Sequence, residues 1–171
     1  IIYLMNGVIG YLSPEGVLIN KQDITEKILR WIVKRVNEYL LIPPLPAVLF
    51  HEKGYIRIVE KEENMTLDTD ELFNYFMYYD PYFMTKYIVF RDLVSRGYIL
   101  VDKSNKEILL LEGWRLDKPK EKLRFILLEE GGSISIKKLY ETINKEDGKW
   151  RYIIACIERR GSVTYYDVAS W

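Results

Sequence analysis

The hydrophobic and polar positions of the chain first predict a β-hairpin. Residues 8–11 and 17–19 are two short, mostly apolar runs. They flank the segment Ser13-Pro14-Glu15-Gly16, in which proline suits the second position of a turn and glycine tolerates positive φ. We therefore expect two antiparallel strands joined at this turn.

The next segment has the spacing of an amphipathic helix. Asp23 is followed three residues later by Glu26, a capping-box pattern, and apolar residues recur at helical spacing from Ile28 to Leu40. Prolines follow from Pro43 onward, and proline lacks the amide that a helix interior needs. The pattern predicts a helix over 28–40 that ends before the prolines.

Elements of both types are predicted along the rest of the chain. Asp68 and Glu71 repeat the capping-box pattern before a helical stretch that Pro81 interrupts. A second helical stretch over 83–96 ends at Gly97, a residue favoured after a helix C-terminus. The other predicted elements are short helices at 48–52 and 136–143 and short strands at 55–60, 98–101, 107–111, 123–128, 152–158 and 162–168.

Together these elements predict an α+β fold in two parts. We expect an N-terminal domain over 1–80 that mixes helix and strand, mostly helical with a small β-hairpin. A C-terminal α/β domain with a mixed sheet is expected over 81–171. The length of 171 residues suits two such small domains.

The composition excludes several classes of function. Lys and Arg number 25, as do Asp and Glu, so the chain has no global basic field that would hold nucleic acid non-specifically. One cysteine and one histidine form neither a disulfide nor a Cys/His zinc cluster. No segment has the apolar length that spans a bilayer, and we expect a reduced, cytoplasmic location. The 14 tyrosines indicate protein partners, because tyrosine is common at interfaces.

Each residue that could bind a metal or act in catalysis also has a structural explanation. The acidic run 68–71 contains helix-capping residues, which favours capping over a metal site. His51 lies near a helix end without a second ligand or nucleophile, and Cys156 lies in an apolar run that does not suit a reactive thiol. No P-loop pattern is present. We expect no metal and no cofactor.

One basic stretch contrasts with the neutral composition. Residues 115–124 contain five cations and follow Trp114. Cations beside an aromatic ring contact RNA phosphates and bases in many proteins, but the spacing alone favours a solvated loop that leads into a strand. The candidate RNA contacts are Lys118, Lys120, Lys122 and Arg124.

Two segments resemble the archaeal tRNA-splicing endonuclease family. Residues 90–98 (FRDLVSRGY) are similar to the signature Y-x-D-L-x-x-R-G-Y, which opens the C-terminal domain of that family. Residues 152–168 are similar to its last two strands, L-x-x-A-x-V-D-x-x-G-x-x-x-Y-Y-x-V. The segment 50–56 also fits the helix, glycine and strand of the N-terminal domain. The resemblance covers about residues 45–171.

The resemblance implies metal-free cleavage of precursor tRNA at a bulge-helix-bulge, leaving a 2′,3′-cyclic phosphate. The family uses a tyrosine as base, a histidine as acid and a lysine that stabilises the transition state. The matching positions hold Lys122 for the acid, Arg151 for the lysine, and no tyrosine in the segment 111–114 that ends at Trp114. Because a lysine with a pKa near 10.4 donates protons poorly at neutral pH, the resemblance implies a non-catalytic structural subunit.

Such a subunit would join a catalytic subunit in an (αβ)2 heterotetramer that acts on precursor tRNA. In the family, the last strand pairs two subunits through its edge, and a usually acidic loop before it enters a basic cleft on the opposite dimer. Here that loop, 158–161, has one acid and two arginines. The expected interface residues are Glu158, Arg159, Arg160, Tyr165, Tyr166, Val168 and Trp171.

Two other functions stay open on the sequence alone. The first is an independent metal-free ribonuclease that uses Tyr98, His51 or Lys122. The second is a non-enzymatic RNA-binding module whose platform is Trp114 with residues 118–124.

Overall fold

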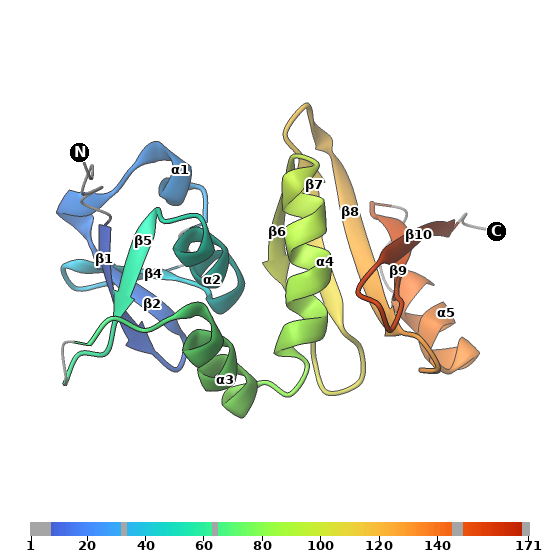
Figure 1. Cartoon of the computed structure of the whole chain (residues 1–171). Coiled ribbons are helices and arrows are strands. Elements are labelled where there is room, and N and C mark those ends of the chain that lie inside the picture. The colour runs from blue at the N-terminus through green and yellow to red at the C-terminus, as the bar shows by residue number, and fades with distance from the viewer. Residues whose placement is uncertain (1–7, 32–33, 63–64, 145–148, 169–171) are drawn as a thin grey trace. The chain divides into compact units, whose positions relative to one another are not determined.

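The computed structural model describes residues 8–31, 34–62, 65–144 and 149–168. The chain divides into two compact units, 1–84 and 85–171 (Figure 1). Each unit contains a five-stranded sheet with one parallel pair of strands among antiparallel ones. The α+β fold class expected from the sequence is therefore confirmed.

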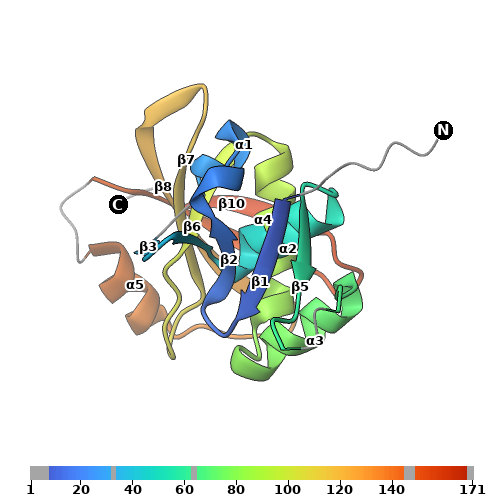
Figure 2. The same ribbon diagram turned by 90° about the vertical axis from the view of Figure 1, so that its left-hand side faces the viewer.

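In the first unit the strand order is β3-β4-β2-β1-β5, and β1 lies between β2 and β5 (Figure 2). The predicted hairpin at Ser13–Gly16 is confirmed, because β1 and β2 pair antiparallel on either side of it. The elements are β1 (Val8–Ser13), β2 (Gly16–Asn20), a 3-10 turn η1 (Lys21–Asp23), α1 (Glu26–Leu29), β3 (Lys34–Val36), β4 (Tyr39–Ile42), α2 (Pro44–Glu52), β5 (Ile56–Val59) and α3 (Thr69–Tyr79).

The helix predicted over 28–40 is wrong. In the described part of this segment only one helical turn, α1, forms, and β3 and β4 then make a second antiparallel hairpin. Its turn contains Asn37 with a φ of 52°, a left-handed conformation that asparagine tolerates better than most residues. The segment is also rich in β-branched side chains, which favour strands. The N-terminal part is consequently not mostly helical.

The predicted helix cap and two of the apolar residues in that helix need separate comment. Asp23 belongs to the 3-10 turn, and the residue that precedes α1 is Thr25. Ile32 and Val33, which also suggested the long helix, lie outside the described residues.

The prolines begin a helix here. Pro43 is the N-cap of α2 and Pro44 its first residue, a position where the missing amide would have had no partner within the helix. Nearby, a Cβ on Gly16 would lie 2.1 Å from the carbonyl oxygen of Ile42, and the φ of Gly16 is 139°. Only glycine lets the first hairpin approach the end of β4 so closely.

In the second unit the strand order is β10-β9-β8-β7-β6, so β10 and β6 are the edge strands. The helix predicted over 83–96 is confirmed as α4, and Gly97 follows it with a φ of 87°. The elements are α4 (Phe83–Ser95), β6 (Tyr98–Asp102), β7 (Leu110–Arg115), β8 (Lys118–Glu129), α5 (Ile136–Asn144), β9 (Arg151–Ile157) and β10 (Val163–Val168). None of the described helices is long and apolar enough to cross a membrane.

The two helices of this unit cover opposite faces of its sheet (Figure 1). Because side chains alternate along a strand, each strand gives residues to both faces. We call the side that contacts Asp92 of α4 through Tyr165 the α4 face. The opposite side, which we call the α5 face, carries the buried residues Leu110, Ile126 and Tyr152, on which α5 packs.

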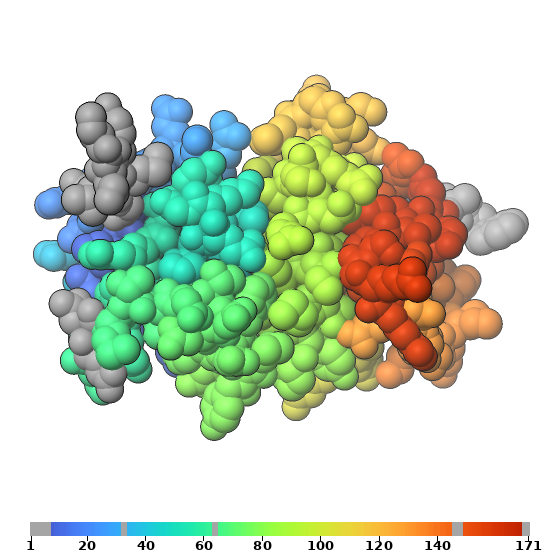
Figure 3. Space-filling model, viewed as in Figure 1, coloured from blue at the N-terminus to red at the C-terminus, as the bar shows by residue number. Residues whose placement is uncertain are grey.

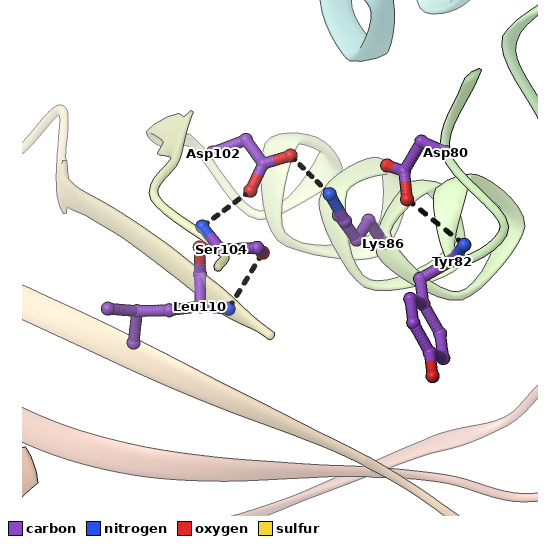
Figure 4. A network of polar contacts seen from close by, with 6 residues as sticks. All are labelled: Asp80, Tyr82, Lys86, Asp102, Ser104 and Leu110. Atoms are coloured by element: carbon purple, nitrogen blue, oxygen red, sulfur yellow. Dashed lines mark hydrogen bonds and ion pairs between the residues drawn. The ribbon is translucent and has the colours of Figure 1, made fainter. Parts of the chain in front are cut away.

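A buried lysine fixes α4 to the sheet. Lys86 is 6% exposed, and its Nζ donates to Oδ2 of Asp102, the last residue of β6, over 2.7 Å (Figure 4). The other carboxylate oxygen accepts from the amide of Ser104 at 2.9 Å, and the Ser104 hydroxyl accepts from the amide of Leu110 at 2.9 Å. This network holds the loop after β6 against the start of β7.

Candidate functional site

The candidate site lies on the α5 face, where β7, β8 and β9 run side by side. The register aligns Glu112 of β7 with Arg124 of β8, and Arg124 with Tyr152 of β9. Three polar side chains therefore form a row across neighbouring strands. Sequence reasoning missed this row, because it depends on the register between strands that are distant in the chain.

An ion pair occupies the centre of this row. Nη2 of Arg124 lies 2.6 Å from Oε1 of Glu112, with side-chain exposures of 12% and 17%. Nη1 of Arg124 donates to the Tyr152 hydroxyl at 2.9 Å, and that hydroxyl donates to the carbonyl oxygen of Thr142 in α5 at 2.9 Å. The carboxylate and the phenol are thus both engaged by neighbours, and neither is placed as a free proton acceptor.

An indole ring packs beside the ion pair. The guanidinium carbon of Arg124 lies 4.3 Å from the Trp150 ring centroid, and Nζ of Lys122 lies 5.6 Å from it. Lys122 is exposed, and Trp150 directly precedes β9. Contacts between cations and an aromatic face hold positive charge and orient it, but they supply no acid suited to neutral pH. The site can attract an anion through the exposed Lys122.

Arg151, matched to the family lysine, lies on the other face. It donates to Asp167 of β10, and its Nη1 lies 2.7 Å from Oε1 of Glu121. The hydrogen bonds from Arg151 lower the pKa of Asp167, and those to Asp167 and Glu121 raise the pKa of Arg151. Since Arg151 alternates with Trp150 and Tyr152 along the chain, the structure does not bring it together with Lys122.

Trp114, two residues after Glu112 in β7, lies at an irregularity of the sheet. The pairing of β7 with β8 shifts between Gly113 and Arg115, and the Trp114 side chain is 39% exposed. A Cβ on Gly113 would lie 1.9 Å from the carbonyl oxygen of Ile99, so the backbone of β7 approaches β6 closely there. Trp114 is therefore an exposed ring at the base of the β7–β8 hairpin.

The basic stretch forms part of a long strand and not a loop before one. β8 begins at Lys118, five residues earlier than predicted, and the hairpin joining it to β7 extends past the end of α4 in Figure 1. Lys118 and Lys120 are exposed on this strand. Arg115 pairs with Asp117 at the turn, Nε to Oδ1, at 2.8 Å.

The residues expected at a subunit interface have different surroundings. Tyr166 is 57% exposed on the edge strand β10, whereas the Tyr165 hydroxyl is 2.6 Å from Asp92 and its ring lies 6.2 Å from that of Phe125. Val168 packs against the apolar cluster beneath α5. Trp171 lies outside the described residues.

In the loop before β10, the single acidic residue, Glu158, forms a hydrogen bond within the loop itself. The Glu158 carboxylate accepts from the Ser162 hydroxyl at 2.7 Å, and Gly161 closes the turn with a φ of 82°. The amide of Arg159 donates to Glu130 at 2.8 Å. Arg159 and Arg160 are both exposed, so the loop presents its cations to solvent.

Other sequence candidates have structural roles. Asp68 and Glu71 form a reciprocal capping box at the start of α3, which confirms the capping interpretation. Nδ1 of His51 lies 3.2 Å from the carbonyl oxygen of Ile56, and Cys156 is partly buried in β9. The ring of Tyr98 contacts Phe125 on the α4 face, so Tyr98 and Lys122 lie on opposite faces of the sheet.

Comparisons with known proteins point to one kind of enzyme. No protein-family model matches the chain. A tRNA-splicing endonuclease of Methanosarcina acetivorans is 26% identical over 159 residues, which cover 92% of this chain and 45% of that protein. A tRNA-splicing endonuclease of Pyrococcus horikoshii is 28% identical over 161 residues, covering 92% of this chain and 93% of that protein. Over nearly its whole length the chain is thus similar to tRNA-splicing endonucleases, which supports the family indicated by residues 90–98 and 152–168.

Proposed function

We propose that this chain is the non-catalytic structural subunit of an archaeal tRNA-splicing endonuclease. It assembles with a catalytic subunit in an (αβ)2 heterotetramer and positions that subunit for cleavage of precursor tRNA at a bulge-helix-bulge in the cytoplasm. The observation that carries the proposal is the occupation of the candidate site by an ion pair, Glu112 with Arg124, and by Lys122 beside Trp150.

This arrangement lacks the general acid and the general base that the reaction needs. The acid position holds Lys122, an exposed side chain, where the family has the histidine that acts as the general acid. Glu112, in the segment where the base is expected, has its carboxylate neutralised by Arg124. Loss of one positioned acid or base costs about 10²–10⁴ in rate, and Arg151, on the opposite face, cannot compensate. The catalytic groups must therefore come from another chain.

The edge strand β10 supports the assembly part of the proposal. Only one side of β10 is paired in the described sheet, with β9, and its outward residue Tyr166 is 57% exposed. An edge strand offers unpaired backbone groups to a second strand, and exposed tyrosine is typical of interfaces. Tyr166 is therefore the residue of β10 that we place against the partner, together with Val168 and Trp171 at the end of the chain.

The exposed lysines of β8 support a contribution to RNA binding. Lys118 and Lys120 extend along the β7–β8 hairpin near Trp114, away from the packed part of the sheet. In the assembled enzyme they and Lys122 would contact phosphates, which fixes the position of the RNA without reading its sequence. Arg124 would have to break its ion pair with Glu112 to reach a phosphate, so we expect it to contribute less to RNA binding than the lysines.

Cleavage of a bulge-helix-bulge RNA by separate and combined subunits tests the proposal. The isolated chain should leave the RNA intact, and adding a catalytic subunit from the same cell should give 2′,3′-cyclic phosphate ends. Sedimentation should find two copies of each chain. Lys122→Ala in this chain should leave the cleavage step unchanged, measured at saturating enzyme. Cyclic phosphate ends made by the isolated chain, and abolished by Lys122→Ala, would overturn the proposal.

A further inference from the structure

The exposed side of α3 and the turn after it carry a cluster of tyrosines. Leu72 and Phe76 face the core and are buried, whereas Tyr78, Tyr79 and Tyr82 are 82%, 52% and 52% exposed. This segment, green in Figure 3, presents its side chains at the surface of the first unit. We call Tyr75, Tyr78, Tyr79 and Tyr82 the α3 tyrosine face.

Ring contacts organise three of these tyrosines. The ring centroids of Tyr75 and Tyr79, one helical turn apart, are separated by 5.2 Å, and those of Tyr78 and Tyr79 by 5.1 Å at an angle of 88°. Burial, followed by a side-chain hydrogen bond with Tyr79, raises the pKa of Tyr75 to about 12. The Tyr75 phenol therefore stays protonated at neutral pH. The three contacting rings form a preordered aromatic surface that loses little rotamer freedom on binding.

The stretch of sequence that contains this face is strongly acidic. Residues 60–84 contain seven acids and one lysine, Lys61, a net charge of −6 within a chain that is neutral overall. The N-cap Asp68 and the first-turn residues Asp70 and Glu71 are acidic, and α3 contains no lysine or arginine. A phosphate backbone or an anionic membrane would be repelled by such a surface, whereas a basic chain segment would be attracted.

Cations already stack on tyrosines elsewhere in the chain. Nζ of Lys27 lies 4.7 Å from the centroid of Tyr55, and the guanidinium carbon of Arg96 lies 5.3 Å from that of Tyr165. Within the described residues no lysine or arginine stacks on a ring of the α3 tyrosine face. Its aromatic surfaces are left for a cation from outside.

We propose that the α3 tyrosine face binds an arginine- or lysine-rich segment of a partner protein. The cations of that segment stack on the rings of Tyr78 and Tyr79, and the surrounding carboxylates provide long-range attraction. The proposal is separate from the assignment of a tRNA-splicing role, because it uses neither the α5 face nor the strand β10.

Binding of a labelled nona-arginine peptide to the full chain, followed by fluorescence anisotropy, tests this proposal. The double variant Tyr78→Ala/Tyr79→Ala should weaken binding about tenfold, the loss of two cation–π contacts. Tyr78→Phe/Tyr79→Phe keeps the ring faces and should bind within about twofold of the wild type. Tyr140→Ala is the matched control, because Tyr140 is 69% exposed on α5 beside lysines and should not affect binding.

A single-stranded RNA of the same length as the peptide serves as the competing probe. We expect the α3 tyrosine face to contribute nothing to RNA binding, so the double alanine variant should bind RNA as the wild type does. Loss of RNA binding in that variant would overturn the proposal in favour of a nucleic-acid surface. Equal peptide binding by the wild type and the double alanine variant, or no peptide binding at all, would also overturn it. Neither result bears on cleavage of precursor tRNA.

Discussion

The hydroxyl of Tyr165 in β10 donates to Oδ2 of Asp92 in α4 over 2.6 Å, a link between residues 73 positions apart. Arg96 stacks over the same ring and forms an ion pair with Asp92, Nε to Oδ2, at 3.0 Å. The neighbouring Tyr166 faces away and is 57% exposed. One tyrosine of the pair thus fixes β10 to its own unit, and the other is left at the surface.

Replacing Tyr165 should destabilise the chain without affecting assembly. Tyr165→Phe removes the hydrogen bond to Asp92 and keeps the ring contact with Phe125. A hydrogen bond to a charged group contributes about 1.5–3 kcal/mol, so the midpoint of urea unfolding should fall accordingly. Tyr166→Phe is the control and should unfold as the wild type does, because its hydroxyl has no comparable partner among the described contacts. An unchanged midpoint in Tyr165→Phe would contradict the assigned role.

The same contact predicts how stability depends on pH. Burial, followed by the hydrogen bond with Asp92, raises the pKa of Tyr165 above its ordinary value of 10.0. A proton held more tightly in the folded state stabilises that state fully below the unfolded pKa, and this stabilisation declines as pH rises past it. Stability should therefore fall above about pH 10, and less steeply in Tyr165→Phe. Unfolding by urea at pH 8, 10 and 11 measures both slopes, and parallel slopes would show that Tyr165 is not responsible.

The ion pair at the candidate site predicts an asymmetric response to mutation. Glu112→Ala leaves the guanidinium of Arg124 in a site where it is 12% exposed, without its carboxylate. Removing one partner of such a pair costs about 2–4 kcal/mol, because the remaining charge stays poorly solvated. Asp117→Ala breaks the exposed pair with Arg115 and should cost less than about 1 kcal/mol. Similar losses of unfolding free energy in the two variants would mean that the Glu112–Arg124 site is well solvated.

Local signals predicted much of this fold, and non-local pairing accounts for the main errors. The capping box of Asp68 and Glu71 and the break at Gly97 are short-range patterns, and α3 and α4 formed as expected. The segment 28–40 has helical spacing, but the pairing of β4 with β2 and a left-handed Asn37 make it a hairpin. Helical spacing alone does not exclude a strand when a turn residue and a neighbouring strand are available.

At the candidate site, too, local sequence patterns identified residues, but only the pairing of distant strands determines which of them lie together. The sequence singled out Lys122 and Arg151, yet alternation along neighbouring strands places them on opposite faces of the sheet. Trp150 and Tyr152 could have been linked to Lys122 and Arg124 by their shared spacing of two residues. That link requires knowing that β8 and β9 are adjacent and parallel, and α5 connects them across 21 intervening residues between Glu129 and Arg151.

The lysines of β8 should contribute to RNA binding through charge alone. In the proposed heterotetramer, Lys118→Ala/Lys120→Ala should weaken binding of precursor tRNA at low salt. The slope of log affinity against log salt should fall by about 2, one for each lost phosphate contact. Fluorescence anisotropy of a labelled precursor tRNA, titrated at several salt concentrations between about 50 and 200 mM, measures this slope. Lys137→Ala, an exposed lysine of α5, is the control. An unchanged slope in the double variant would place the RNA elsewhere.

The loop before β10 leads to a prediction about the proposed heterotetramer. The resemblance implies an acidic loop that enters a basic cleft on the opposite dimer, yet here Glu158 is engaged by Ser162 and the exposed side chains are Arg159 and Arg160. Two arginines entering a basic cleft would be repelled, and cations removed from water need carboxylates to compensate them. We therefore expect the partner's cleft to be acidic.

Arg159→Asp/Arg160→Asp tests this expectation in sedimentation experiments with the catalytic subunit. The double charge reversal should dissociate the proposed (αβ)2 heterotetramer into αβ dimers, because it would place acid against acid, whereas the pairing proposed for the edge of β10 would be unaffected. Arg159→Lys/Arg160→Lys preserves the charge and should keep most of the tetramer. Higher salt should weaken the wild-type tetramer and partly rescue the charge-reversed one, since screening reduces attraction and repulsion alike. A tetramer that the aspartate substitutions leave unchanged or strengthen would instead indicate a basic cleft that receives Glu158.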